Sequence, residues 1–164
     1  MAFFAGIGSR QTPINIIKDM VHISKKLVSA GYTLRSGGAD GADSAFELGA
    51  DNAILTDDHE RKQIFLPWKG FNKRVSQFDH PTHDAFEIAK KFHPAWNKLS
   101  SGGKALHARN VHQILGPDLD SPVEFVVCWT PDGQISGGTG QALRIAMKLE
   151  IPIHNLAIKP FVMP

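Results

Sequence analysis

The sequence has little of several features that would each assign it to a class of protein. It contains one cysteine, Cys128, in 164 residues, so an internal disulfide is excluded and a reducing, cytoplasmic location is expected. No segment approaches the roughly 18 consecutive apolar residues of a membrane span. The first five residues, Met-Ala-Phe-Phe-Ala, lack the basic region of a signal peptide. We therefore expect a cytoplasmic protein with no membrane partner.

Strong charge and metal-binding patterns are also missing. The formal net charge is only +2, which does not by itself indicate nucleic-acid binding. The eight histidines form no His-Glu-x-x-His pattern and have no cysteine partners, so we expect no metal and no cofactor. Without a Gly-x-Ser-x-Gly elbow, and with Cys128 inside an apolar run, a covalent nucleophile is not expected either.

What the sequence does contain is the pattern of an α/β fold. Hydrophobic residues make up 42% of the chain, which suits a globular protein, and its length suits a single domain over residues 1–164. Apolar runs predict strands at residues 2–7, 32–35, 63–67, 122–129 and 151–156. Helical spacing predicts helices at residues 13–30, 42–50, 83–92, 104–115 and 139–149, the first with Thr12 as N-cap and Pro13 at its first position.

Alternating strands and helices predict a Rossmann-like three-layer α/β sandwich with a central, mainly parallel sheet. In such sheets a ligand binds beyond the carboxyl ends of the strands, where the strand order reverses. Three glycine clusters follow predicted strands at that end: Gly6-Ile7-Gly8-Ser9-Arg10, Ser36-Gly37-Gly38-Ala39-Asp40-Gly41 and Ser136-Gly137-Gly138-Thr139-Gly140.

Glycine lets backbone N–H groups approach an anion closely, and a helix N-terminus adds partial positive charge. We therefore expect one crevice that binds the phosphate of a nucleotide or nucleotide-derived molecule. The predicted phosphate-binding residues are Gly8, Ser9, Arg10, Ser36, Gly37, Gly38, Gly137, Gly138, Thr139 and Gly140. The alternative is that these glycines only form tight turns and that Arg10 is solvated.

Two further groups of polar residues are candidates for the site. Asp40, Asp43 and Glu47 follow the second cluster, where they could contact a sugar or activate water, so we predict catalytic roles for them. The alternative is that acids in a first helical turn only complement the helix dipole. Arg109 and Asn110 lie within a predicted helix; Arg109 is a candidate catalytic residue and Asn110 a candidate ligand contact, with an exposed surface position as the alternative.

The three clusters, together with Ala108-Arg109-Asn110, occur in an order that resembles the SLOG superfamily. That group includes DprA/Smf, the LOG phosphoribohydrolases and the YspA-like proteins. The run Ser-Gly-Gly-Ala-Asp-Gly-Ala-Asp, with Phe46-Glu47, is most similar to the small YspA-type branch. The resemblance implies a Rossmann-like sheet, a nucleotide-derived ligand and a homo-oligomer.

One departure from the family affects the expected chemistry. LOG enzymes carry Pro-Gly-Gly-x-Gly-Thr-x-x-Glu, and here Ser136, Gln141 and Arg144 replace the proline, threonine and catalytic glutamate. The segment around Arg109 does match that of the LOG arginine. The resemblance thus implies nucleotide binding, with N-glycosidic hydrolysis as its enzymatic form and a non-catalytic sensor as the alternative.

A third alternative is DprA-like binding of single-stranded DNA. Between the third strand and the next helix, aromatic and basic residues alternate in a way that could stack on bases and follow a phosphate backbone. These residues are Trp68, Lys69, Phe71, Lys73 and Arg74. The simpler interpretation is a loop anchored by its aromatic side chains.

Overall fold

The computed structural model describes residues 1–164 and contains one five-stranded sheet in the order β3-β2-β1-β4-β5. Every adjacent pair of strands is parallel. The strands are β1 (Ala2–Gly8), β2 (Tyr32–Ser36), β3 (Lys62–Ile64), β4 (Phe125–Trp129) and β5 (Ile153–Asn155). The fold is an α/β Rossmann-like sandwich, which confirms the predicted class.

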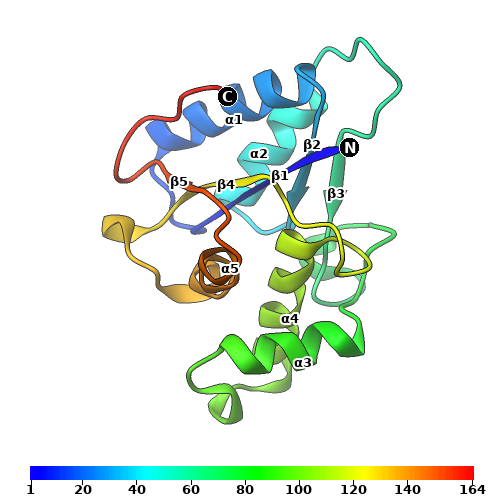
Figure 1. Ribbon diagram of the computed structural model, residues 1–164, viewed down its shortest axis with the longest axis vertical. Coiled ribbons are helices and arrows are strands. Elements are labelled where there is room, and N and C mark those ends of the chain that lie inside the picture. The colour runs from blue at the N-terminus through cyan, green and yellow to red at the C-terminus, as the bar shows by residue number, and fades with distance from the viewer.

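Helices cover both faces of the sheet, which explains why its central strands read as unbroken apolar runs. The helices are α1 (Ile14–Ser29), α2 (Ala42–Asp51), α3 (His83–Phe92), α4 (Ser101–Leu115) and α5 (Gly137–Lys148). Figure 1 shows α1 and α2 on one face and α3, α4 and α5 on the other. None of these helices is both long and apolar enough to cross a membrane.

Two apolar clusters hold these layers together, one on each face. Alternate residues of β1 divide between them: Phe4 packs with Met20 and Leu27 of α1, whereas Ala5 packs with the α4 and α5 side. Phe4 and Ala5 are fully buried. Because side chains alternate across a strand, one short apolar strand supplies both cores.

The ends of several elements differ from the predicted ones. Helix α1 begins at Ile14 after Pro13, and Thr12 does not cap it. Instead, the Thr12 hydroxyl donates a 2.6 Å hydrogen bond to the Ser9 carbonyl, which closes the turn after β1. Helix α5 begins at Gly137, two residues earlier than predicted. The third glycine cluster is therefore the first turn of a helix and not a loop before it.

The strand order reverses between β1 and β4. The chain runs outward from β1 to β2 and β3, and then returns to place β4 on the other side of β1. The segments that follow β1 and β4 diverge to opposite faces of the sheet. They leave a crevice at the carboxyl ends of these two strands, as in other open parallel sheets.

Candidate functional site

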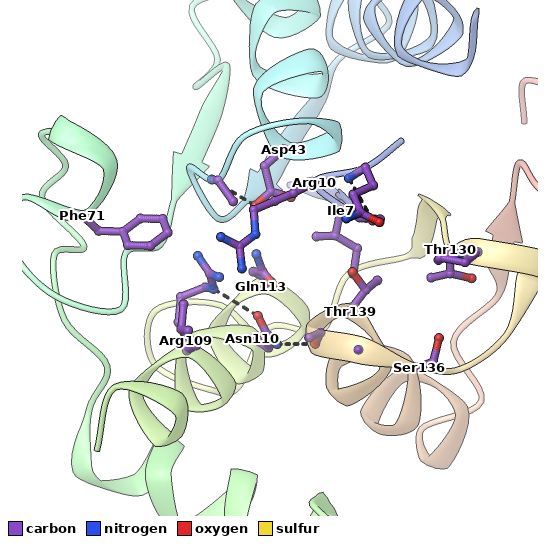
Figure 2. Close-up of a pocket in the computed structure, with 18 residues that line it drawn as sticks. Ile7, Arg10, Asp43, Phe71, Arg109, Asn110, Gln113, Thr130, Ser136 and Thr139 are labelled. Carbon is purple, nitrogen blue, oxygen red and sulfur yellow. Dashed lines mark hydrogen bonds between the residues drawn. The ribbon is translucent and has the colours of Figure 1, made fainter. Parts of the chain in front are cut away.

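A cavity of about 430 Å³ lies at this point of reversal. Its walls come from Gly8–Gln11 after β1, Ala39 and Asp43 around the start of α2, and Ser136–Thr139 at the start of α5. Helix α4 forms one side with Leu106, Arg109, Asn110 and Gln113. Figure 2 shows Arg10 and Asp43 facing this helix across the cavity. Segments more than one hundred residues apart in the sequence thus meet at one site.

The start of α5 has the features of an anion site. Its first residues, Gly137, Gly138 and Thr139, line the cavity, and no side chain caps their N–H groups. The first N–H groups of any helix lack partners within the helix and carry its partial positive charge. Neither Gly137 nor Gly138 has another group within 4 Å of the position of a Cβ. Gly140 is buried behind them, and its N–H bonds to the Ser136 carbonyl at 3.0 Å.

Arg109 supplies a fixed positive charge at the side of the cavity. It is 6% exposed. Its Nη1 donates to the Gly37 carbonyl, and its Nε donates to Asn110 Oδ1 at 3.0 Å. No protein group accepts from Nη2, so two of its N–H donors are unused. Burial lowers the pKa of Arg109, and the charge of Asp43 opposes that shift. The guanidinium also lies 5.6 Å from the ring centre of Phe71.

Asp43 faces Arg109 from the start of α2. Its Oδ2 accepts a 3.2 Å hydrogen bond from the Ala39 N–H. Burial raises the pKa of this carboxyl to about 6, although Arg109 pulls it down. The two side chains do not form a direct ion pair. A carboxyl that titrates near neutral pH inside a cavity is suited to acid–base chemistry.

The first glycine cluster contributes the side chain of Arg10 to the cavity rather than free backbone N–H groups. The Ser9 N–H already donates to the Trp129 carbonyl at 3.1 Å, so it is not free to bind an anion. Gly8 is needed for close packing, because a Cβ there would lie 2.8 Å from the Ala42 Cβ and the Trp129 carbonyl oxygen. Arg10 is exposed at the cavity wall and free to reach a ligand.

The second cluster lies beside the cavity but offers carbonyl groups instead of N–H groups. The carbonyl of Gly37 accepts from Arg109, and that of Gly38 accepts from Asn72 at 3.0 Å. Ser36 is fully buried and donates 2.6 Å to the Gly6 carbonyl. These three predicted phosphate contacts therefore do not line the cavity, and of them only Gly37 positions a cavity residue, Arg109, through its carbonyl.

Two predicted catalytic acids also lie outside the cavity. Asp40 is exposed, and its Oδ1 accepts from Asn72 at 3.1 Å. Glu47 lies one helical turn after Asp43, beyond the cavity lining, where it pairs with Lys62 at 2.7 Å and with Arg74. Both acids tie the segment after β3 to α2. Only Asp43 of the three acids reaches the cavity.

The aromatic and basic segment contributes one side chain to the cavity. Phe71 lines it, and its ring meets Trp68 edge to face at 5.3 Å. Arg74 is held by Glu47, whereas Lys69 and Lys73 are exposed. The Asn72 bonds to the second glycine cluster hold this segment at the edge of the site.

Several residues that line the cavity were not predicted from the sequence, among them Gln113, which has 2% of its surface exposed. A signal for it was present. Gln113 lies four residues after Arg109 and three after Asn110, so all three share one face of α4. Thr130 and Ser136 also line the cavity.

Comparison with known proteins gives a likeness in fold only. No protein-family model matches the sequence, and no curated protein matches it. Among solved structures, DNA processing protein A (DprA) of Helicobacter pylori, studied for its single-stranded DNA binding mode, has a TM-score of 0.56 at 16% identity. The match covers 94% of this chain, which spans 64% of the length of that one. At this identity the likeness supports the Rossmann-like fold.

Proposed function

We propose that this chain binds a nucleotide, with the phosphate at the start of α5. The observation that carries the proposal is the uncapped first turn Gly137–Thr139, which faces the same cavity as Arg10 and Arg109. Free N–H groups at a helix N-terminus and arginine side chains both bind phosphate groups well. Together they would neutralise most of a phosphate monoester's charge.

The rest of the cavity suits the remainder of a nucleotide. Its volume of about 430 Å³ lies within the range typical of small-molecule sites. Ile7 and Leu106 are apolar, and the ring of Phe71 offers a stacking surface for a base. These features favour a single nucleotide unit, and they are compatible with the SLOG resemblance, which we extend to a proposal of membership.

The enzymatic form of the proposal is hydrolysis of the N-glycosidic bond. Water would form a bond from its oxygen to the sugar carbon as the bond to the base breaks, and one proton of the water would end on the departing base, giving a sugar phosphate and the free base. Asp43 supports this step, because a carboxyl with a pKa near 6 can activate water or stabilise a cationic sugar. Helix α5 contains no Asp or Glu. Arg144, which stands where LOG enzymes carry glutamate, bonds to the Phe92 carbonyl at 3.1 Å and to Gln141 at 2.7 Å. Chromatography for released base distinguishes this enzyme from a non-catalytic sensor.

The second candidate function is DprA-like binding of single-stranded DNA. It is favoured by the fold likeness to DprA, and by the position of Phe71 and exposed Lys73 at the edge of the site. This candidate predicts that oligonucleotides bind more tightly than mononucleotides and that affinity falls steeply with salt. Charge removal at Lys73 would reduce that salt dependence.

Calorimetric titration tests the main proposal directly. Purified protein is titrated with the four ribonucleoside monophosphates and, separately, with a single-stranded 20-mer. We expect at least one mononucleotide to bind with a Kd in the micromolar range and to compete with the oligonucleotide if both bind. Absence of binding by every mononucleotide would contradict the main proposal. Tight, salt-sensitive binding of the 20-mer alone would favour the second candidate.

A further inference from the structure

One buried polar side chain of the cavity has no hydrogen-bond partner in the protein. Gln113 is 2% exposed and lines the cavity, yet its carboxamide makes no hydrogen bond with any other lining residue (Figure 2). Buried carboxamides almost always have hydrogen-bond partners. The carboxamide of Gln113 faces the open cavity without a protein partner, so it is free to bond a group on the ligand.

The neighbours of Gln113 determine which hydrogen bonds a ligand group at this place can make. The carboxamide nitrogen of Gln113 and the guanidinium of Arg109 both pack against Gly37, so two sets of N–H donors stand side by side. Arg109 Nη2 adds donors that no protein group uses. Across the cavity is Asp43, which is acceptor-only when ionised and does not pair directly with Arg109.

We infer that Gln113 and Asp43 recognise a hydroxyl of the ligand's sugar, and that the site therefore prefers ribonucleotides to 2′-deoxyribonucleotides. A hydroxyl is the group that accepts from Gln113 and Arg109 while donating to Asp43. A phosphate in this place would be repelled by Asp43, and an ammonium group would be repelled by Arg109. With the phosphate at the start of α5, the ribose spans the space toward Asp43, and its 2′-hydroxyl meets this pair.

The inference rests on the proposed nucleotide function, and it narrows that function. It assigns the preference for ribose to Gln113, which lies outside the three glycine clusters. It also opposes DNA as the ligand, because a deoxyribose strand leaves both Gln113 and Asp43 without the hydroxyl.

The test compares each ribonucleoside monophosphate with its 2′-deoxy counterpart by calorimetry. The wild-type protein is expected to bind the best ribonucleotide about tenfold or more tightly than the 2′-deoxy form, as when a hydrogen bond to a charged group is lost. Gln113→Met keeps the length of the side chain but removes its polar atoms. This variant should bind the ribonucleotide more weakly and so reduce the preference about threefold or more, since only the Asp43 and Arg109 bonds to the hydroxyl remain, with the deoxy Kd within about threefold of wild type. Gln77→Met, at an exposed position away from the cavity, is the matched control and should keep the preference.

The outcomes distinguish failure of the ribose inference from failure of the proposed nucleotide-binding function. Equal affinity of the wild-type protein for ribo and deoxy forms would overturn the inference and leave nucleotide binding intact. Equal weakening of both forms by Gln113→Met would assign the residue a structural role, which also overturns it. Failure of every nucleotide to bind would overturn the proposed function itself.

Discussion

Asn110 Nδ2 donates a 2.8 Å hydrogen bond to the carbonyl of Gly138. Its Oδ1 accepts from Arg109 at 3.0 Å, so one buried carboxamide joins the cavity's fixed cation to the first turn of α5. Both groups that would contact a phosphate are therefore positioned by the same residue. The proposed phosphate site therefore depends on contact between two helices as much as on its glycines.

Replacing Asn110 by alanine should weaken both binding and folding. The Gly138 carbonyl loses its donor and Arg109 loses an acceptor, so we expect nucleotide Kd to rise about tenfold. The free energy of unfolding should fall by about 1–2 kcal/mol. Calorimetry and urea denaturation measure the two effects.

The matched control is Ser24→Ala, which removes a buried hydrogen bond to the Phe46 carbonyl far from the cavity. It should lower stability without changing the nucleotide Kd. An Asn110→Ala variant with normal affinity would refute the positioning role.

Replacing Gly138 by alanine should separate binding from stability. A Cβ at this helical position meets no other group within 4 Å, and alanine is the better helix former, so stability should stay the same or rise by about 0.5 kcal/mol. The methyl group enters the space beside the free N–H groups, and we expect affinity to fall about fivefold or more. Gly102→Ala in α4, whose Cβ would make only ordinary contacts, should leave affinity unchanged. Unaltered binding by Gly138→Ala would place the anion elsewhere.

The stability of the protein should depend on the protonation of Asp43. Its pKa is about 6 in the folded protein, above the ordinary value of 3.8, so the folded state binds a proton more tightly than the unfolded chain. Stability from this group is therefore greatest below about pH 4, falls as pH rises to about 6, and is constant above that. A difference of about two pKa units corresponds to roughly 3 kcal/mol.

The Asp43→Asn variant tests this dependence of stability on the protonation of Asp43. Above pH 6 it should be more stable than wild type by up to about 3 kcal/mol, and the two proteins should converge near pH 4. The same variant should lose any release of base from nucleotides. Urea denaturation at pH 4, 5, 6 and 8 measures the stability difference. A constant difference across this range would mean that Asp43 is not a buried carboxyl with a raised pKa.

Removing the charge of Arg109 should raise the pKa of Asp43 further. Arg109 is the largest influence that lowers this pKa against the effect of burial. In Arg109→Met, the carboxyl carbon of Asp43, followed by ¹³C NMR, should titrate above the wild-type midpoint near pH 6. Arg109→Lys should keep the midpoint nearer to wild type but bind nucleotide more than tenfold more weakly, because lysine lacks the fixed planar fork. An unchanged Asp43 midpoint in Arg109→Met would show that the two groups do not interact.

The fold could be predicted from the sequence because its central strands are buried on both faces, which leaves continuous apolar runs such as Phe125–Trp129. The position of the third glycine cluster at the cavity followed from the topology of a parallel sheet. The sequence did not predict which way the backbone N–H and carbonyl groups of these turns point. Glycine-rich turns can present N–H or carbonyl groups, and only the fold determines that Gly37 and Gly38 present carbonyls to Arg109 and Asn72.

The separation of the three acids was also beyond sequence reasoning. Asp43 and Glu47 lie four residues apart on α2, yet only Asp43 reaches the cavity. Glu47 pairs with Lys62 and Arg74, and these partners come from segments whose approach to α2 no local pattern encodes. Gln113 could have been found, because helical spacing places it on the same face as Arg109.

The most direct test of phosphate binding at the start of α5 is an NMR titration of ¹⁵N-labelled protein with a ribonucleoside monophosphate. The account predicts that the largest amide shifts belong to Gly137, Gly138 and Thr139, with the Arg109 side-chain Nε–H shifting in parallel and at the same Kd. Saturable shifts that leave these three amides unmoved, or that centre on a surface away from α5, would contradict it.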